Sequence, residues 1–597
     1  MWKSILLIPC ICPHFSTAKS TPERSFQKTS ITQKFIYPTA RRSNTTEIFH
    51  NKYVIDNKYD WMENPDSQET IDFSTAQNKI THDFLKTYPY RNTLKSRLVS
   101  LTDYEKKGLP WKGGGKDSSS QFWYVWHKSG LDNFSTLYQL DSPEDEITNG
   151  RVFLNAEKID PTGLTSISGA SISPDGSLCG YLTSRAGSDW KRIAFRNTKS
   201  DENGVFTEKV DVLKNVKYSR ITWSKDGKGV FYGAYPDQSG KTDGTETTKA
   251  EFQKVFYHRI GEPQERDILV AETPEDSEMD NEVVISSCGK FIFKYMSKHF
   301  KHVLYFSKMN DDKSIPEDFL WTPISVKFDA RVGVVHFDEP KLILVSYFNA
   351  PNGKLVEIDL EETNSEPNEL NTTFKIKDFV PENEFPIRGT YVVADKFLLI
   401  KYMKDCKDIV MKYDLATGNF LKEIVLPDLG SIQISSDVFD SSIYMKLSGW
   451  VNPGSLYKYD IITDEISLTS QTIIPGLDQS LLQTTQIFYY SKDGTTKIPM
   501  FLVHKRGLKL DSKNPTYLYG YGGFDRSLTP RFSTKFALWC NDMNGVLAIA
   551  NIRGGGEYGD RWHDAGKGMN KQNSFDDFQA GAEWLISNEY RVLWKKC

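Results

Sequence analysis

The chain has 597 residues, of which 39% are hydrophobic and 25% are charged, as in an ordinary globular protein. One hydrophobic core supports only about 250–300 residues, so we expect two large domains. A formal charge of -4 offers no basic surface typical of nucleic-acid binding. No apolar run reaches the roughly 18 residues that a membrane span needs, so we expect neither a nucleic-acid nor a membrane partner.

The seven cysteines are scattered along the chain without a metal-ligand spacing. They stand at positions 10, 12, 179, 288, 406, 540 and 597. We expect reduced thiols in a cytoplasmic protein, and neither a metal nor another cofactor.

The first 44 residues differ in texture from the rest. Residues 1–34 are rich in Ser and Thr and carry five basic side chains against one acid, Glu23. A short apolar run, Ser4–Cys12, is interrupted by Pro9, and no clean cleavage site follows it. We expect residues 1–44 to be a disordered or targeting extension, which leaves secretory or organellar targeting open beside the cytoplasmic prediction.

The next segment, residues 45–104, is predicted to be mainly helical. Its pattern is polar and helical from Tyr53 to about Tyr104. A run from Asp60 to Ser67, Asp-Trp-Met-Glu-Asn-Pro-Asp-Ser, starts this helical region.

Residues 105–476 are predicted to be short β-strands joined by tight turns. A polar turn precedes a strand at Ser171–Gly176, Thr222–Gly227 and Val284–Gly289, and strands end at Asp141, Asp359, Asp414 and Asp460. The spacings are 51 residues from Asp175 to Asp226, 55 from Asp359 to Asp414 and 46 from Asp414 to Asp460. A period of about 50 residues matches one four-stranded propeller blade, so about 370 residues predict a seven-bladed β-propeller.

The predicted propeller offers no obvious chemistry. His258, His299 and His302 stand alone in strand patterns. Solitary histidines of this kind are usually surface or satisfied core residues, so we assign none of them a catalytic role.

Residues 477–597 begin with a hairpin of alternating strands around Ser491–Gly494. The next strand, from Thr516, runs into Gly520-Tyr-Gly-Gly-Phe524, where glycines let the backbone turn sharply and approach a substrate. A further strand runs into Asn551-Ile-Arg-Gly-Gly-Gly-Glu-Tyr-Gly559. No Gly-Lys-Ser/Thr follows to complete a phosphate-binding loop, so we do not expect phosphate binding there. We expect instead that Arg553 and Glu557 organise this loop by ion pairing.

An amphipathic helix is predicted after these loops. Ser574 is expected to cap it, and Asp576 and Asp577 complement the positive end of its dipole. An apolar face is formed by Phe575, Phe578, Ala582 and Leu585, and the helix is expected to extend through Asn588.

These motifs, in this order, resemble the prolyl oligopeptidase (prolyl endopeptidase) family over about residues 45–590. The resemblance implies a seven-bladed β-propeller (105–476) that caps an α/β-hydrolase domain (477–597), with residues 45–104 as the N-terminal arm of the hydrolase domain. It implies a monomeric serine endopeptidase that cleaves short proline-containing peptides through an acyl-enzyme. It also implies that Tyr521 donates its hydroxyl to the oxyanion and that Phe524 helps to form the proline pocket.

The nucleophile motif Gly-x-Ser-x-Gly occurs nowhere in the 597 residues. The resemblance fails near Arg591, before the expected order Ser, Asp, His begins. We therefore expect a C-terminally truncated, incomplete hydrolase domain, assign no catalytic residue, and predict that the chain as written is inactive.

Two alternatives remain open at this stage. The first is a non-enzymatic propeller protein that binds peptides or partners and keeps a vestigial hydrolase half. The second is a sister peptidase, such as an oligopeptidase B, which prefers basic residues and needs an acidic pocket that the sequence does not show.

Overall fold

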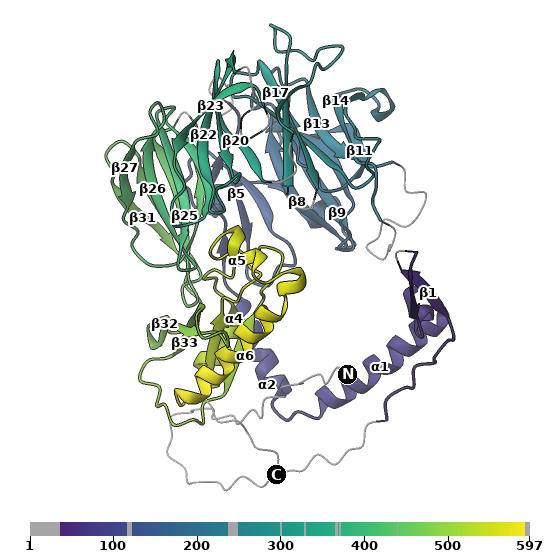
Figure 1. Ribbon diagram of the computed structural model, residues 1–597, viewed down its shortest axis with the longest axis vertical. Coiled ribbons are helices and arrows are strands. Elements are labelled where there is room, and N and C mark those ends of the chain that lie inside the picture. Colours follow the sequence, from purple (N-terminus) through teal and green to yellow (C-terminus); the bar gives the residue numbers. More distant parts are fainter. Residues whose placement is uncertain are drawn as a thin grey trace. The chain divides into compact units, whose positions relative to one another are not determined.

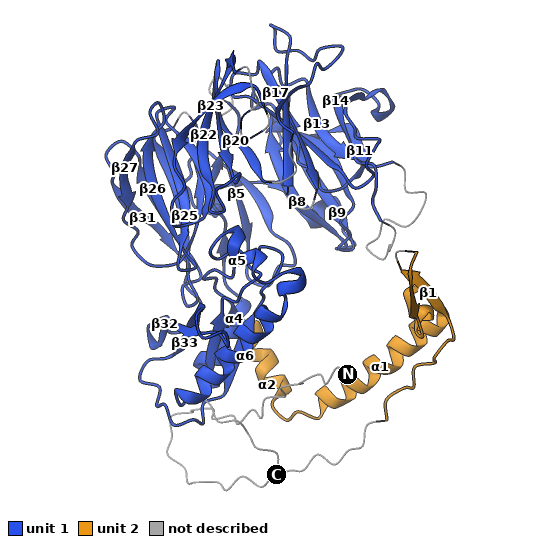
Figure 2. Cartoon of the chain, in the orientation of Figure 1, with its two compact units in different colours: residues 1–13, 102–597 blue, residues 14–101 orange. Residues whose placement is uncertain are grey.

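The computed structural model describes residues 36–49, 51–115, 122–236, 249–298, 301–326, 330–364, 368, 370, 372–438 and 440–590. They form two compact units, and the boundary lies between Leu101 and Thr102 (Figure 2). Most of the predicted extension, residues 1–35, lies outside the described residues. No helix of the described ranges is long and apolar enough to cross a lipid bilayer.

The smaller unit combines a β-hairpin with helices (Figure 1). Ser67 caps α1, because its Oγ accepts a hydrogen bond of 3.2 Å from the backbone N–H of Thr70. The helical prediction is confirmed from Gln68 onward but wrong for Tyr53–Asp56, which pairs antiparallel with the preceding strand. The elements are β1 (Thr46–Phe49), β2 (Tyr53–Asp56), the 3-10 helix η1 (Asp60–Glu63), α1 (Gln68–Lys86) and α2 (Arg91–Thr102).

Seven antiparallel blades follow in the described part of the larger unit, each built from consecutive strands. Blades 2 and 3 join into one eight-stranded sheet through the single pair Val216–Ala234. Because each blade is continuous in sequence, its strands pair through tight hairpins between neighbours in the chain.

The first three blades hold strands β3 to β15. Blade 1 contains β3 (Lys106–Lys107), β4 (Trp111–Lys112), β5 (Trp123–Lys128), β6 (Thr136–Leu140) and β7 (Arg151–Leu154), blade 2 contains β8 (Thr165–Ile172), β9 (Leu178–Arg185), β10 (Lys191–Ser200) and β11 (Phe206–Val216), and blade 3 contains β12 (Thr222–Trp223), β13 (Gly229–Ala234), β14 (Lys254–Arg259) and β15 (Ile268–Ala271). Three short helices lie in their loops, namely η2 (Ile147–Asn149), α3 (Ala156–Ile159) and η3 (Gln264–Arg266).

The other four blades hold strands β16 to β31. Blade 4 contains β16 (Asp280–Ile285), β17 (Phe291–Lys298), β18 (Lys301–Lys308) and β19 (Thr322–Ser325), blade 5 contains β20 (Val332–Asp338), β21 (Lys341–Ser346), β22 (Lys354–Thr363) and β23 (Phe374–Val380), blade 6 contains β24 (Ile387–Val393), β25 (Phe397–Lys404), β26 (Lys407–Asp414) and β27 (Phe420–Ile424), and blade 7 contains β28 (Ser431–Ser435), β29 (Ser442–Ser448), β30 (Ser455–Asp460) and β31 (Ile466–Gln471).

The two sequence signatures mark fixed places in the blades. The polar turns join the first and second strands of blades 2, 3 and 4, where a glycine adopts a positive φ, as at Gly176 (φ 76°). Ser173 donates 2.5 Å to Asp175, and Ser224 donates 2.6 Å to Asp226 in the same turn of the next blade. Of the aspartates in the second signature, Asp414 and Asp460 are the last residues of the third strand and Asp141 follows it directly, whereas the expected strand end at Asp359 is wrong because β22 continues to Thr363. Asp460 accepts 2.8 Å from Ile462 N–H and so shapes the turn into the fourth strand.

Side chains join blade 1 to blade 7. Glu144, after β6, accepts hydrogen bonds of 2.9 Å from both the Tyr444 hydroxyl and Lys458 Nζ. Lys446 donates 2.6 Å to the carbonyl of Lys107, and the rings of Trp123 and Tyr444 meet edge to face.

After the propeller comes a mixed sheet with strand order β32-β33-β35-β34, in which only β34 and β35 are parallel. Leu547 and Ile549 pack with Cys540 on one face, while Ala548 and Ala550 pack with Leu585 on the other, so α4 and α6 cover opposite faces. The elements are η4 (Gln479–Leu481), β32 (Leu482–Tyr490), β33 (Lys497–Lys505), β34 (Thr516–Gly520), α4 (Thr534–Asn541), β35 (Val546–Ala550), α5 (Asp560–Asp564), η5 (Gly568–Asn570) and α6 (Gln572–Ser587). The predicted domain boundaries after residues 44, 104 and 476 stay predictions.

Candidate active site

The glycine-rich loop after β34 requires glycine at its tightest point. Gly522 has φ 58°, and a Cβ there would lie 2.6 Å from Ile552 and 2.9 Å from the carbonyl of Arg553. The backbone stays in the left-handed region at Phe524 and Asp525, both with φ 54°. Two consecutive non-glycine residues in this region store strain that the surroundings must hold, a feature that clusters at functional sites.

The structure places Tyr521 and Phe524 beside each other on this loop. Their ring centroids lie 6.5 Å apart, and the side chains are 41% and 71% exposed. Both rings therefore remain accessible to a ligand. The assigned roles, oxyanion donor for Tyr521 and proline contact for Phe524, stay predictions.

A cavity of about 400 Å³ adjoins Tyr521. Its walls come from Trp450, the end of β34, the segment Arg526–Ser533 and the first turn of α4. The lining includes the aromatic side chains of Trp450, Tyr519, Tyr521, Phe532 and Phe536 and the basic ones of Arg526, Arg531 and Lys535.

The loop after β35 is anchored by a buried ion pair that differs from the predicted one. Arg553 Nη2 lies 2.6 Å from Asp577 Oδ1, and Arg553 Nη1 lies 3.0 Å from Asp493 Oδ2. Asp577 is fully buried and also accepts from the Arg553 backbone N–H at 2.9 Å. The predicted Arg553–Glu557 pair is wrong, because packing of α6 brings the Asp577 carboxylate to the guanidinium instead.

Glu557 is buried in another place and organises a different segment. Its Oε1 accepts hydrogen bonds from the Leu528 N–H at 2.9 Å and from Asn551 Nδ2 at 3.1 Å. Burial raises the pKa of its carboxyl above the ordinary range. Glu557 therefore joins the segment after Phe524 to the end of β35, a role that its sequence position alone did not reveal.

The helix that Ser574 is expected to cap begins earlier, at Gln572, and ends at Ser587. Ser574 Oγ donates 2.7 Å to the carbonyl of Arg553, so it ties the helix to the loop and is no N-cap. The buried face of α6 is formed by Ser574, Asp577, Ala580, Gly581 and Leu585, whereas Phe575 is half exposed. A period-3.6 pattern that includes the small and polar residues identifies this face; one based on large apolar residues alone does not.

The propeller contacts the same loops through two arginines. Arg331, just before β20, forms ion pairs with Asp525, at 2.8 Å, and with Asp560. Arg388 on β24 donates to Ser527 Oγ and to the carbonyl of Gly556. Blades 5 and 6 thus hold both glycine-rich loops in place.

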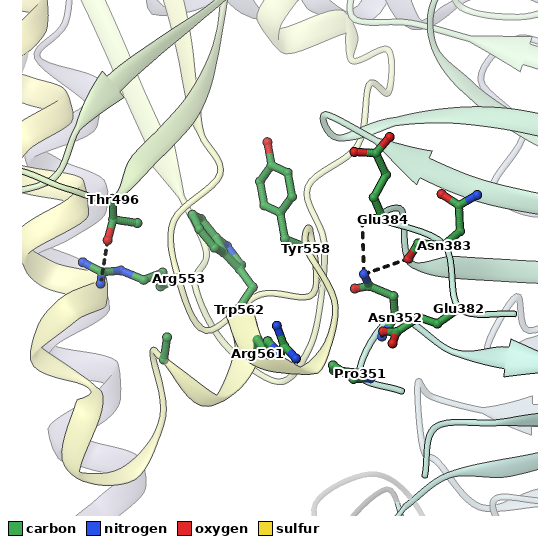
Figure 3. A pocket seen from close by; sticks show the side chains of 11 residues that line it. Pro351, Asn352, Glu382, Asn383, Glu384, Thr496, Arg553, Tyr558, Arg561 and Trp562 are labelled. Atoms are coloured by element: carbon green, nitrogen blue, oxygen red, sulfur yellow. Dashed lines mark hydrogen bonds between the residues drawn. The ribbon is translucent and has the colours of Figure 1, made fainter. Parts of the chain in front are cut away.

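A second cavity, of about 600 Å³, is lined by residues of the propeller and by residues of the chain that follows it (Figure 3). Its propeller wall includes Asn352, whose amide donates 3.0 Å to the Asn383 carbonyl and 3.1 Å to that of Glu384. Its other wall holds Tyr558 and Trp562, with ring centroids 5.0 Å apart. Over the described residues, no three His, Cys, Asp or Glu side chains gather as a metal site would require.

Of the propeller histidines, His258 is fully buried and its Nδ1 lies 2.7 Å from Asp267 Oδ1. His302 Nδ1 lies 3.2 Å from the carbonyl of Val332. Both have protein partners, as expected for structural histidines, and His299 lies outside the described residues.

Comparison with known proteins gives matches over most of the chain. The family model "Prolyl oligopeptidase, N-terminal beta-propeller domain" matches residues 37–472, and "Prolyl oligopeptidase family" matches residues 530–592. The chain is 31% identical to a prolyl oligopeptidase, ophP, of Omphalotus olearius over 577 residues, covering 93% of this chain and 75% of that protein. It is 31% identical to a prolyl endopeptidase of Elizabethkingia miricola over 571 residues, covering 93% and 73% of the two chains.

Solved structures agree with these matches. Prolyl oligopeptidase B from Galerina marginata, bound to a 35mer hydrolysis and macrocyclization substrate, superposes with a TM-score of 0.84 at 27% identity, covering 93% of this chain and 77% of that chain. The predicted fold class, a seven-bladed β-propeller with an α/β-hydrolase domain, is confirmed.

Proposed function

Because this chain belongs to the prolyl oligopeptidase family, we propose that the protein serves as a serine endopeptidase of that family, acting on short peptides after proline. The observation that carries this proposal is the loop Gly520–Phe524, in which Tyr521 lines a cavity and the exposed ring of Phe524 lies beside that of Tyr521. In the proposed reaction the Tyr521 hydroxyl donates to the oxyanion of the tetrahedral intermediate. Losing one such donor costs about 2.7–4 kcal/mol of transition-state stabilisation.

The endopeptidase reaction needs a nucleophile, so for these 597 residues we propose peptide binding without turnover. They contain no Gly-x-Ser-x-Gly motif to supply the nucleophile. We expect no hydrolysis of a Gly-Pro chromogenic reporter by the purified chain. Turnover that persists after removal of contaminating peptidases would contradict this part of the proposal.

Peptide binding tests the part of the proposal that concerns proline. Calorimetry would compare a blocked Gly-Pro peptide with a blocked Gly-Ala peptide on the 597-residue chain. We expect the Gly-Pro peptide to bind better and Phe524→Ala to weaken it about tenfold, since the lost ring contact amounts to roughly 1.4 kcal/mol.

Phe575→Ala is the matched control, because Phe575 is also exposed but lies on α6. We expect it to leave peptide binding unchanged. Equal binding of both peptides, with no effect of Phe524→Ala, would instead favour a non-enzymatic propeller that binds other partners, which the missing nucleophile motif also suggests.

A further inference from the structure

The segment Arg526–Ser533 separates two cavities that share its side chains. One is the cavity of about 400 Å³ beside Tyr521. The other, of about 510 Å³, lies against β24, β25, β28 and β29 of blades 6 and 7. Ser527, Thr529, Arg531 and Phe532 line both, so the two cavities adjoin across this segment.

Basic side chains outnumber acidic ones in the lining of the two cavities. Six of them line the space, against one carboxylate, Asp408; the six are Arg388, Lys401, Lys446, Arg526, Arg531 and Lys535. The chain as a whole has a formal charge of -4, so this excess of positive charge is local. We call these six side chains the basic tract.

Most of the tract is not neutralised within the described residues. Lys401 lies 3.5 Å from Asp408, and the charge of Arg388 acts on Asp408 and Glu557. Among the described side chains, no ion pair with a carboxylate is present for the other four, Lys446, Arg526, Arg531 and Lys535. Lys446 instead donates to a carbonyl, and burial lowers its pKa because the charged form is poorly solvated. A bound anion would supply the missing counter-charge.

The first turn of α4 adds to the positive potential. It carries Lys535 and no acidic side chain, and Ser533 makes no side-chain capping bond there. Partial positive charge at a helix N-terminus ordinarily favours acids, so a lysine at this place is unfavourable unless an anion binds. The six side chains would attract an anion without this contribution.

We propose that the basic tract binds carboxylates of the peptide, so that the protein selects acidic peptides. This inference rests on the proposed function, because it places the acidic group next to a peptide held at Tyr521 and Phe524. The guanidinium of an arginine can hold a carboxylate with two parallel hydrogen bonds. The carboxylates can come from Glu and Asp side chains or from the free C-terminus of a short peptide.

Calorimetry with a set of blocked Gly-Pro peptides tests the proposal on the 597-residue chain. One peptide carries three Glu residues and a C-terminal amide, the second three Gln residues and an amide, and the third three Gln residues and a free carboxyl terminus. At low salt we expect the Glu peptide to bind about tenfold more tightly than the Gln amide, since each exposed pair contributes only a little. Because the Debye length falls from about 10 Å at 0.1 M to 3 Å at 1 M salt, the advantage should shrink as salt is added.

The triple variant Arg526→Gln, Arg531→Gln, Lys535→Gln should abolish the advantage. Its matched control is Arg185→Gln, Arg192→Gln, Lys214→Gln, which removes the same charge from exposed positions of blade 2 that line none of the cavities described above. Circular dichroism would check that both variants are folded. Equal affinities for Glu and Gln peptides, or an advantage that survives in the triple variant, would overturn the proposal.

The remaining comparisons separate the sources of the carboxylate and the two proposals. If the free-acid peptide binds more tightly than the Gln amide, and the triple variant removes this difference, the peptide C-terminus is a ligand of the basic tract. If the Glu amide binds more tightly than the Gln amide, the Glu side chains are its ligands. Gly-Ala versions of the peptides separate this inference from the proposed function. If Glu still raises the affinity but proline does not, the tract binds carboxylates while the peptidase proposal fails. If proline raises the affinity but Glu does not, only the tract proposal fails.

Discussion

At the residue scale, burial of the Glu557 carboxyl makes the stability of the fold depend on pH. It is 1% exposed, and its Oε2 has no hydrogen-bond partner within the described structure. Burial raises its folded pKa above the unfolded value, so its contribution to stability falls as pH rises from the unfolded pKa through the folded one. We expect Glu557→Gln, which keeps the acceptor for Leu528 N–H, to stabilise the protein by about 1–3 kcal/mol at pH 8 and by less at pH 5.

Chemical denaturation at the two pH values measures this difference. Glu384→Gln is the matched control, because Glu384 is exposed and such surface changes usually stay within about 0.5 kcal/mol. A Glu557→Gln variant that is destabilised at pH 8, or whose change in stability is the same at both pH values, would show that the buried carboxylate does not destabilise the folded protein.

At the element scale, Glu144 contributes to the closure of the propeller between blades 1 and 7. Every blade is made of consecutive strands, so side chains between blades 1 and 7 must close the ring. Glu144→Ala leaves the hydroxyl of Tyr444, a residue 2% exposed, without its acceptor and also removes the partner of Lys458. We expect a loss of about 1–3 kcal/mol, because an unsatisfied buried hydroxyl costs more than a surface ion pair.

Hydrogen exchange of blades 1 and 7 should rise in Glu144→Ala while the middle blades change less. Glu144→Gln retains an acceptor and should keep most of the protection. Glu146→Ala, two residues further along the same loop and exposed, should leave exchange unchanged. Uniform loss of protection across all blades would mean that ring closure is not the local weak point.

At the scale of the whole molecule, Arg331 and Arg388 hold the propeller against the glycine-rich loops. Arg331 is 26% exposed and pairs with Asp525 and Asp560. Removing it leaves two partly buried carboxylates without their cation, which we expect to cost about 1–3 kcal/mol after allowance for solvent screening. In calorimetry, Arg331→Met should lower or separate the melting transition of the hydrolase part from that of the propeller.

Arg220→Met provides the comparison, because Arg220 is 82% exposed and forms a surface pair with Glu282. Exposed pairs of this kind contribute about 0–1 kcal/mol, so its melting should match the parent chain. Adding Asp525→Asn to Arg331→Met should recover part of the loss. If Arg331→Met melts like the parent chain, the two arginine contacts do not couple the domains.

Local signals in the sequence were enough for the fold and insufficient for the site contacts. The Ser-x-Asp-Gly turns recur because each uses the same hydrogen bond, as Ser173 and Ser224 show, and a recurring local interaction is visible in sequence. The partner of Arg553 is different in kind. Asp577 lies 24 residues away and reaches the guanidinium only after α6 packs on the sheet, whereas Glu557 is nearer in sequence but occupies another buried place.

The order of strands within the propeller also bears on how such a protein can be inherited and altered. Since each blade is encoded by one unbroken stretch, duplication or loss of that stretch adds or removes a whole sheet without splitting any other. If one blade instead combined strands from the two ends of the chain, adding or removing that blade would need two coordinated genetic changes. A new first or last blade would then have to replace the contacts that join blades 1 and 7, namely the hydrogen bonds of Glu144 and Lys446 and the contact between the rings of Trp123 and Tyr444.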